Sequence, residues 1–307
     1  MRRYFLLLGS VLFLSNVTIA QTTPADTSYW KSGSQSTITF SQVSLTNWAA
    51  GGENSTAVNG FFNVFADYRK GRRKWHTSLD LGYGLLKQGE KRIRKSDDQI
   101  NFVTRFGYQL NPTNEKLYLS TFLNLRTQFA EGYAVDDPDS LISKFLAPGY
   151  LTVGVGLEYA ANEFVSFGYK PLAGKFTFVS ADIVGDAGAY GVESGKTSRV
   201  ELGSYFRFSY KQEAFKNVNV DTRFELFTGY ETEAFGNIDV NWQNTIVMKI
   251  NEHLSTNLFT QLLYDDDVKI DVDTNNDGVV DQSGPRVQFK SVFGIGLIYQ
   301  FGDKIEK

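Results

Sequence analysis

The stretch Arg286–Phe301, which reads RVQFKSVFGIGLIYQF, decides the fold predicted for this chain. From Val287 to Phe301 every second position is large and apolar, with Ser291 as the one gap. Such period-two alternation predicts a β-strand with one apolar face. The stretch is longer than the roughly 5–6 residues of an ordinary soluble strand. Since a tilted strand crosses a bilayer in roughly 9–11 residues, we predict a transmembrane strand.

The end of this stretch, Tyr299-Gln300-Phe301, resembles the closing strand of bacterial outer-membrane barrels. The resemblance implies that the barrel-assembly machinery recognises this strand as an insertion signal. It also implies that outer-membrane lipid surrounds the folded chain.

The composition agrees with a barrel. The chain has 307 residues, among them 25 Phe, 16 Tyr and no Cys, yet its mean hydropathy is −0.26. Many aromatic residues with a polar average are typical of a transmembrane barrel, because a polar lumen offsets the apolar outer face. A soluble β-sandwich can show the same composition. The absence of Cys excludes disulfides and thiolate metal sites.

The N-terminal residues predict secretion. Arg2 and Arg3 precede an apolar run from Tyr4 to Leu14, and Thr18-Ile19-Ala20 offers a cleavage site. We predict a signal peptide over 1–20, a short flexible periplasmic lead over 21–36, an outer-membrane barrel over 37–302 and a C-terminal tail over 303–307. The net charge of −3 does not indicate a nucleic-acid partner.

Eleven earlier segments repeat the alternation, so the fold class is all-β, an antiparallel up-and-down transmembrane β-barrel of about 12 strands. The segments are 37–47, 55–69, 75–87, 99–110, 117–130, 148–159, 164–180, 198–211, 218–230, 238–250 and 254–265. A change of phase between Phe40 and Val43 predicts a bulge in the first. Pro171 and Gly174 predict a bend or break in the seventh.

The connections sort by length. Those at 70–74, 111–116, 160–163, 212–217 and 251–253 are short, and those at 88–98, 131–147, 182–197 and 266–285 are long. Short periplasmic turns alternating with long external loops are typical of outer-membrane barrels, and a β-sandwich has no reason to sort its loops in this way. Both termini then lie in the periplasm.

The polar faces of the strands carry the residues expected to line the lumen. These are Asp67, Asp80, Arg105, Arg126, Glu201, Arg207, Asp221, Arg223, Glu225 and Lys249. Turning Arg223 toward lipid would cost about 2–4 kcal/mol at the midplane. Because both signs are present, we expect a lumen partly filled by paired side chains. The alternative is a ladder of Arg105, Arg126, Arg207 and Arg223 that selects anions.

One loop has the spacing of a calcium site. Asp273, Asn275, Asp277, Val279 and Asp281 provide the alternate oxygens of a D-x-N-x-D-G loop. At the twelfth position Gly284 replaces the bidentate Glu of an EF-hand, so we expect only weakly bound calcium in the loop 266–285. The alternative is a hairpin loop held by its own Asp and Asn side chains. No other cofactor is expected.

His76, Ser78 and Asp80 share one face of a predicted strand. Residues two apart on a strand are separated by roughly 6–7 Å, whereas the contacts of a catalytic triad need roughly 2.6–3.2 Å. We therefore predict lumen-lining residues and no catalytic residue here.

Several stretches together resemble the DUF3078 family of secreted proteins of unknown function from Bacteroidetes-type bacteria. They are Ser41–Asn54 (SQVSLTNWAAGGEN), Lys95–Asp98 (KSDD), Arg126–Phe129 (RTQF), Phe145–Tyr150 (FLAPGY), Tyr264–Asp267 (YDDD) and Gln288–Lys290 (QFK). The resemblance implies an outer-membrane β-barrel and no established activity.

We therefore expect a non-enzymatic channel or small-solute transporter of the outer membrane. Its solute is not given by the sequence. The alternatives are a lipid hydrolase on a barrel scaffold and a structural or binding barrel with a blocked lumen.

Overall fold

The computed structural model describes residues 29–45, 53–134, 139–184, 188–231, 237–272, 274 and 281–302. The expected signal peptide, the lead as far as residue 28 and the tail over 303–307 lie outside the described residues.

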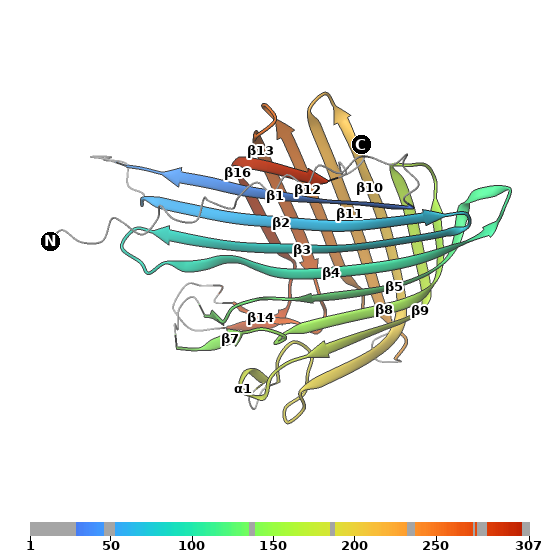
Figure 1. Ribbon diagram of the computed structural model, residues 1–307. Coiled ribbons are helices and arrows are strands. Elements are labelled where there is room, and N and C mark those ends of the chain that lie inside the picture. The colour runs from blue at the N-terminus through green and yellow to red at the C-terminus, as the bar shows by residue number, and fades with distance from the viewer. Residues whose placement is uncertain are drawn as a thin grey trace, which may run out of the picture.

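Twelve antiparallel strands form one closed barrel in the order β1-β16-β13-β12-β11-β10-β9-β8-β5-β4-β3-β2 (Figure 1). They are β1 (Trp30–Val43), β2 (Ser55–Lys70), β3 (Arg73–Gln88), β4 (Arg94–Asn111), β5 (Asn114–Thr127), β8 (Gly149–Ala160), β9 (Val165–Phe178), β10 (Ser198–Phe215), β11 (Val218–Gly229), β12 (Asp239–Lys249), β13 (Leu254–Tyr264) and β16 (Gln288–Gly302). The predicted fold class is confirmed. Pairing of β1 with β16, from Gly33↔Gly302 to Phe40↔Ile295, closes the sheet and leaves no unpaired edge to face lipid.

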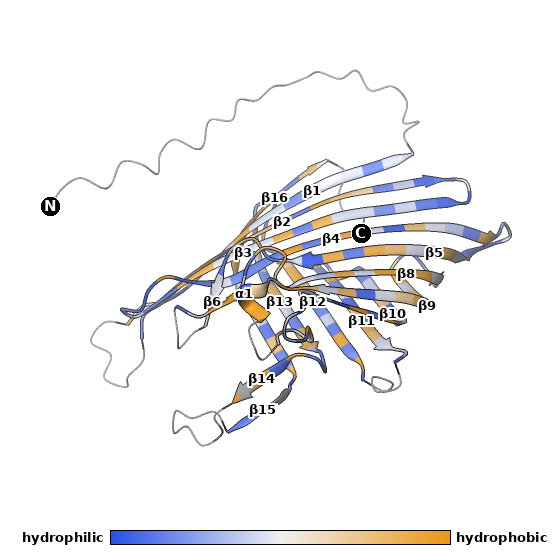
Figure 2. Cartoon of the chain, turned by 90° about the horizontal axis from the view of Figure 1, so that it is seen from below, coloured by the Kyte–Doolittle hydropathy of each residue, from blue (hydrophilic) through white to orange (hydrophobic). Residues whose placement is uncertain are grey.

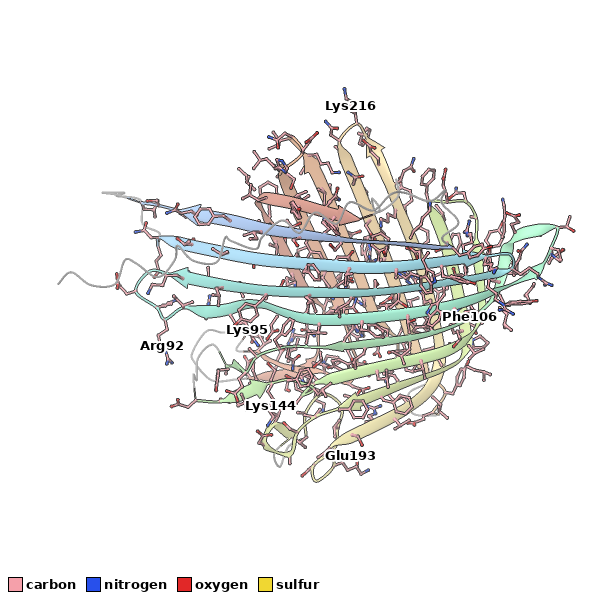
Figure 3. The ribbon with its side chains drawn as sticks, in the orientation of Figure 1. Arg92, Lys95, Phe106, Lys144, Glu193 and Lys216 are labelled. Atoms are coloured by element: carbon pink, nitrogen blue, oxygen red, sulfur yellow. The ribbon has the colours of Figure 1, made fainter. Side chains whose placement is uncertain are left out.

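The two ends of the barrel differ. At one end tight turns join neighbouring strands, for example between Lys70 and Arg73 or between Phe215 and Val218. The other end carries two small hairpins, β6 (Gly132–Tyr133) with β7 (Leu141–Ser143) and β14 (Lys269–Val272) with β15 (Gln282–Pro285), and the short helix α1 (Ala181–Val184). In Figure 3, Lys144 and Glu193 mark these loops and Lys216 marks a tight turn.

Two expectations about strand boundaries and one about a bulge are wrong. β1 begins at Trp30 rather than at 37, because this segment pairs with β2 from Trp30↔Tyr68 onward. The long loop expected over 88–98 is shorter, since β4 begins at Arg94 and pairs with β3. No bulge separates Phe40 from Val43, where the register with β2 is continuous. Backbone pairing overrides the local change in apolar phase at this strand end.

The alternation along the strands separates two faces (Figure 2). Large apolar side chains lie exposed on the outer face, among them Ile38, Leu119, Leu202, Phe293 and Leu297. Polar side chains from the intervening positions fill the interior, where Asn59, Asn124, Thr177 and Glu201 are buried. An apolar exterior and a polar interior suit a barrel in a bilayer. Among the described residues, no helix has the length and apolar character needed to cross a membrane.

Aromatic residues gather on the outer face at the tight-turn end. Trp30 packs against Tyr68 with ring centroids 5.0 Å apart and against Trp75 at 6.1 Å. Near them Lys70 lies over the Tyr29 ring at 4.3 Å. Amphipathic rings next to cationic side chains are typical of the level of the lipid headgroups.

The irregularity predicted at Pro171 is a bulge within a continuous strand. Opposite β10, the partners skip from Gly203↔Ala173 to Tyr205↔Lys170, and the register with β8 shifts at the same place. Tyr169 and Leu172 are exposed on the outer face, whereas Lys170 and Lys175 are buried inside. The bulge therefore reverses the phase of β9 and turns both lysines into the lumen.

Candidate functional site in the barrel lumen

The lumen contains two cavities. The inner cavity, of about 130 Å³, lies toward the tight turns and includes His76, Lys211 and Asp221 in its lining. The outer cavity, of about 300 Å³, lies toward the long loops and includes Gln128, Tyr190 and Asp265. Both are lined by strands from around the barrel, so residues distant in sequence contribute to each.

The cavities adjoin at a constriction. The residues that line both are Asn124, Arg126, Tyr205, Glu225 and Asn241. Tyr205 stacks on Phe122 with ring centroids 4.5 Å apart and donates its hydroxyl to Glu225 Oε1 at 2.7 Å. Asn241 donates to the other carboxylate oxygen at 3.0 Å. These contacts fix the side chains that lie between the two cavities.

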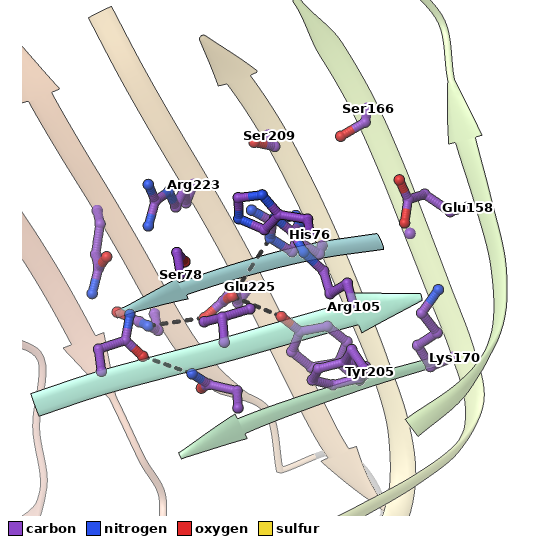
Figure 4. Close-up of a pocket in the computed structure, with 18 of the residues that line it drawn as sticks. His76, Ser78, Arg105, Glu158, Ser166, Lys170, Tyr205, Ser209, Arg223 and Glu225 are labelled. Atoms are coloured by element: carbon purple, nitrogen blue, oxygen red, sulfur yellow. Dashed lines mark hydrogen bonds and ion pairs between the residues drawn. The ribbon is translucent and has the colours of Figure 1, made fainter. Parts of the chain in front are cut away.

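The inner cavity has an excess of positive charge. Its cationic side chains are Arg105, Arg126, Lys170, Arg207, Lys211 and Arg223, and its carboxylates are Glu158, Asp221 and Glu225. Figure 4 shows His76, Arg105, Lys170 and Tyr205 around this cavity, each from a different strand.

Part of this charge is compensated. Arg223 contacts Asp221 at 3.2 Å and Asp80 at 3.5 Å. Arg207 lies 3.7 Å from Glu225. Glu158 accepts a hydrogen bond at 2.7 Å from Lys74, which lies outside the cavity lining. The carboxylate of Glu158 is therefore already occupied by a cation.

Four cations of the inner cavity make no ion pair with the residues that the structure describes: Arg105, Arg126, Lys170 and Lys211. Lys170 is only 3% exposed, and its one described hydrogen bond is donated to the Leu157 carbonyl at 3.2 Å. The Nε of Arg126 is buried without a hydrogen-bond partner. Removing the partner of a buried charge typically costs about 3–5 kcal/mol, so this arrangement calls for a compensating anion or water.

Apart from Arg126, the charges in and around the outer cavity are paired. Lys175, which is 5% exposed, contacts Asp239 at 2.6 Å, Asp265 at 3.1 Å and Glu201 at 3.7 Å. Lys290 contacts Asp97 at 2.8 Å. These pairs connect strands on different sides of the barrel, so we assign the outer cluster a structural role.

Polar contacts connect the loops at the end of the barrel where the outer cavity lies. Tyr190 donates its hydroxyl to the Ile142 carbonyl at 2.7 Å, and burial raises its pKa. Lys144 contacts Asp182 at 2.5 Å. The hydrogen bond from Lys144 lowers the pKa of Asp182.

The structure brings most of the residues predicted for the lumen into it. Arg105, Arg126, Arg207, Asp221, Arg223 and Glu225 line the inner cavity. Asp80 accepts a hydrogen bond from Asn101 at 3.2 Å, and Glu201 lies in the outer charge cluster.

The remaining two lie nearer the tight turns. The carboxylate of Asp67 forms a hydrogen bond with His76 Nδ1 at 2.6 Å. Lys249 ends β12 on the same strand face as Gln243, outside the lining of both cavities.

His76, Ser78 and Asp80 do not form a triad. His76 contacts Asp67 instead, and Asp80 contacts Asn101 and Arg223. Within the described part of the chain, no Ser or Thr hydroxyl is hydrogen-bonded to His76. His76 is therefore not placed to act as a general base for a hydroxyl nucleophile among the described residues.

The predicted calcium ligands Asp273, Asn275, Asp277 and Val279 lie outside the described residues. Asp281 accepts hydrogen bonds from the backbone and side chain of Thr274, and these bonds lower its pKa. Among the described residues no group of three or more His, Cys, Asp or Glu side chains is placed to hold a metal. Calcium in this loop stays a prediction, testable by the response of the melting temperature to calcium and to Asp277→Ala.

Sequence reasoning missed several charged lumen residues. They are Lys74, Glu158, Lys170, Lys175, Lys211 and Asp239. Lys211 continues the face of Arg207 and Ser209, so the period-two pattern of β10 contained that signal. Lys170 and Lys175 have opposite parity, and only the bulge at Pro171 brings both inside.

Comparison with known proteins gives one family. Residues 40–133 match the model of the family described as "Protein of unknown function (DUF3078)", which confirms the predicted resemblance over these residues. A search of curated proteins gives no significant match.

Solved barrels are similar in architecture. The COG4313 outer membrane channel from Pseudomonas putida F1 aligns at 14% identity and a TM-score of 0.39, covering 92% of this chain and 100% of that one. The translocator domain of autotransporter NalP from Neisseria meningitidis aligns at 10% identity and a TM-score of 0.29, covering 89% of each. A TodX monoaromatic hydrocarbon channel mutant aligns at 8% identity and a TM-score of 0.30, covering 90% of each chain. The fold assignment for this chain stands on its own strand pairing.

Proposed function

We propose, for a barrel whose residues 40–133 match the DUF3078 family, that it is a passive channel for small polar solutes in the outer membrane. The membrane location is supported by the closed sheet with exposed apolar side chains around it. A folded barrel of this type is expected to migrate differently on a gel when boiled and unboiled. Equal migration, with the chain in the aqueous fraction without detergent, would contradict the location.

One observation carries the proposal: two cavities, each lined by both polar and apolar side chains, adjoin along the lumen at the constriction around Tyr205 and Glu225. Together they extend from the loop end toward the tight turns. A polar pore lining with charged side chains at its narrow point is the arrangement by which channels admit and select solutes.

The constriction gives the test. In planar bilayers, the purified protein is expected to show discrete conductance steps. Tyr205→Ala removes the ring that stacks on Phe122 and the hydroxyl that is donated to Glu225, so the unit conductance is expected to rise about twofold or more, since conductance grows as the narrowest section widens.

Tyr210→Ala is the matched control. Tyr210 lies on the same strand at a position of opposite parity, and its hydroxyl is donated to Gln212 at 3.1 Å. Its removal is expected to leave the unit conductance unchanged. Absence of conductance in both the natural protein and Tyr205→Ala would support the alternative of a binding barrel with a blocked lumen.

A further inference from the structure

We infer that the inner cavity is a binding site for a small oxyanion, a carboxylate or a phosphate, so that the barrel selects anionic solutes. The inference rests on the proposed channel function for the route by which the anion arrives. It does not depend on that function for the existence of the site.

The first argument is the pattern of pairing. Arg105, Arg126, Lys170 and Lys211 face the inner cavity without an ion-pair partner among the described residues. The surrounding carboxylates are engaged elsewhere: Glu158 by Lys74, Asp221 by Arg223 and Glu225 by Tyr205 and Asn241. The positive charge is therefore available to an incoming anion.

The second argument is the burial of one lysine. Lys170 is 3% exposed, and its ammonium group donates one described hydrogen bond, to the carbonyl of Leu157. An ammonium group has three donors, so the other two can reach a ligand or water in the cavity. Arg105 pairs across the sheet with His76 and Phe122, which places a second cation in the same wall (Figure 4).

The third argument is the contrast between the two cavities. The outer cavity contains the carboxylates Asp97, Asp98, Asp239 and Asp265, and its lysines, the buried Lys175 and the half-buried Lys290, form ion pairs with three of them. If the charges served only to stabilise the barrel, the inner cavity would show the same pairing. Arg105, Lys170 and Lys211 line only the inner cavity, whereas Arg126 lines both.

Size and lining define the ligand class. A cavity of about 130 Å³ is smaller than the roughly 300–1,000 Å³ that drug-sized ligands occupy. Phe122 and Tyr205 form one wall next to the cations. The site therefore fits a small carboxylate or inorganic phosphate, with room beside the charged group for a short apolar portion.

Binding is measured by calorimetry on the full barrel in detergent, titrated with inorganic phosphate and, separately, with acetate. We expect saturable binding of at least one probe. The probe that binds more tightly shows whether the site prefers a phosphate or a carboxylate. Arg105→Gln combined with Lys170→Gln is expected to weaken this binding at least tenfold. Lys216→Gln, the loss of one positive charge at a tight turn outside the cavity (Figure 3), is expected to have no effect.

Two further variants protect the test against misfolding. Arg105→Lys keeps the charge and is expected to retain binding within a few-fold. Ser166→Glu adds a carboxylate to the lining of the cavity and is expected to abolish binding without removing any cation. Binding that is absent in the natural protein, or equal in Ser166→Glu, would overturn the proposal.

The reversal potential in a KCl gradient separates this inference from the channel function. Anion preference that falls toward neutrality in the double variant supports both. Conductance without anion preference and without probe binding contradicts the oxyanion site alone. Probe binding without conductance contradicts the channel and leaves the site standing.

Discussion

Lys170 and Lys175 lie on the same strand, β9, and are buried to nearly the same degree, at 3% and 5% exposed. Their surroundings differ completely. Lys175 contacts three carboxylates from other strands, whereas Lys170 donates only to a backbone carbonyl. A buried lysine that forms ion pairs with carboxylates holds a structure together, and a buried lysine that faces a cavity without forming such a pair offers its charge to a ligand.

The largest effect expected from this comparison is on stability. Lys175→Met leaves Asp239, Asp265 and Glu201 close together without a cation, and breaking a buried ion pair in this way costs about 3–5 kcal/mol. Lys170→Met removes a cation that has no carboxylate partner, so the free energy of unfolding is expected to stay the same or to rise. Urea unfolding in liposomes, followed by tryptophan fluorescence, measures both.

The comparison is decided by which of the two variants, Lys175→Met or Lys170→Met, has the lower free energy of unfolding. If Lys170→Met destabilised the barrel as much as Lys175→Met, Lys170 would be a structural residue and the distinction between the two cavities would fail. Lys175→Arg keeps a cation among the carboxylates and is expected to recover part of the loss.

The second prediction concerns the bulge that brings both lysines inside. Gly156 faces it from β8, and a Cβ there would overlap the Tyr169 carbonyl oxygen and lie 2.7 Å from Lys170 Cα. Gly156→Ala is therefore expected to destabilise the barrel by about 1–3 kcal/mol, the usual cost of overpacking. It is also expected to weaken oxyanion binding, because the backbone that orients Lys170 must move.

Gly60→Ala is the matched control, since a Cβ at Gly60 would lie 3.8 Å from its nearest neighbour, the Tyr83 carbonyl oxygen. We expect little change in unfolding free energy or in binding. Equal effects of the two substitutions would show that Gly156 is not required by the close approach of the bulge.

The sequence predicts the sheet well because the bilayer and the lumen act on alternate residues of every strand. Period-two alternation was enough to predict the closed barrel and to turn Arg105, Arg126 and Arg223 inward. It could not assign Lys170 and Lys175 to the same face, because one extra residue in β9 reverses the phase.

Pairing across the lumen was also beyond the sequence. Lys175 and Asp265 belong to β9 and the segment after β13, and Lys290 reaches Asp97 from β16. These contacts depend on the curvature of the whole sheet rather than on spacing along the chain. For that reason the sequence favoured a salt-bridged lumen throughout, whereas in the structure three of the four cavity cations without an ion pair among the described residues, Arg105, Lys170 and Lys211, line only the inner cavity.

The smallest effect is expected where a pair of charges lies outside the lumen. Asp182 of α1 contacts Lys144 near β7, and the side chains are 51% and 33% accessible to water, respectively. The hydrogen bond from Lys144 lowers the pKa of Asp182 below its ordinary value of 3.8. A lowered folded-state pKa stabilises the contact above the ordinary value, and this contribution disappears as the pH falls through the lowered pKa.

Asp182→Asn is therefore expected to leave global unfolding unchanged at neutral pH, because solvent screens an exposed pair. It should increase amide hydrogen exchange only in α1 and the neighbouring loop, to the level that the natural protein reaches on acidification. A global loss of stability like that expected for Lys175→Met would show that the external loops, and not the charge cluster of the outer cavity, hold this end of the barrel together.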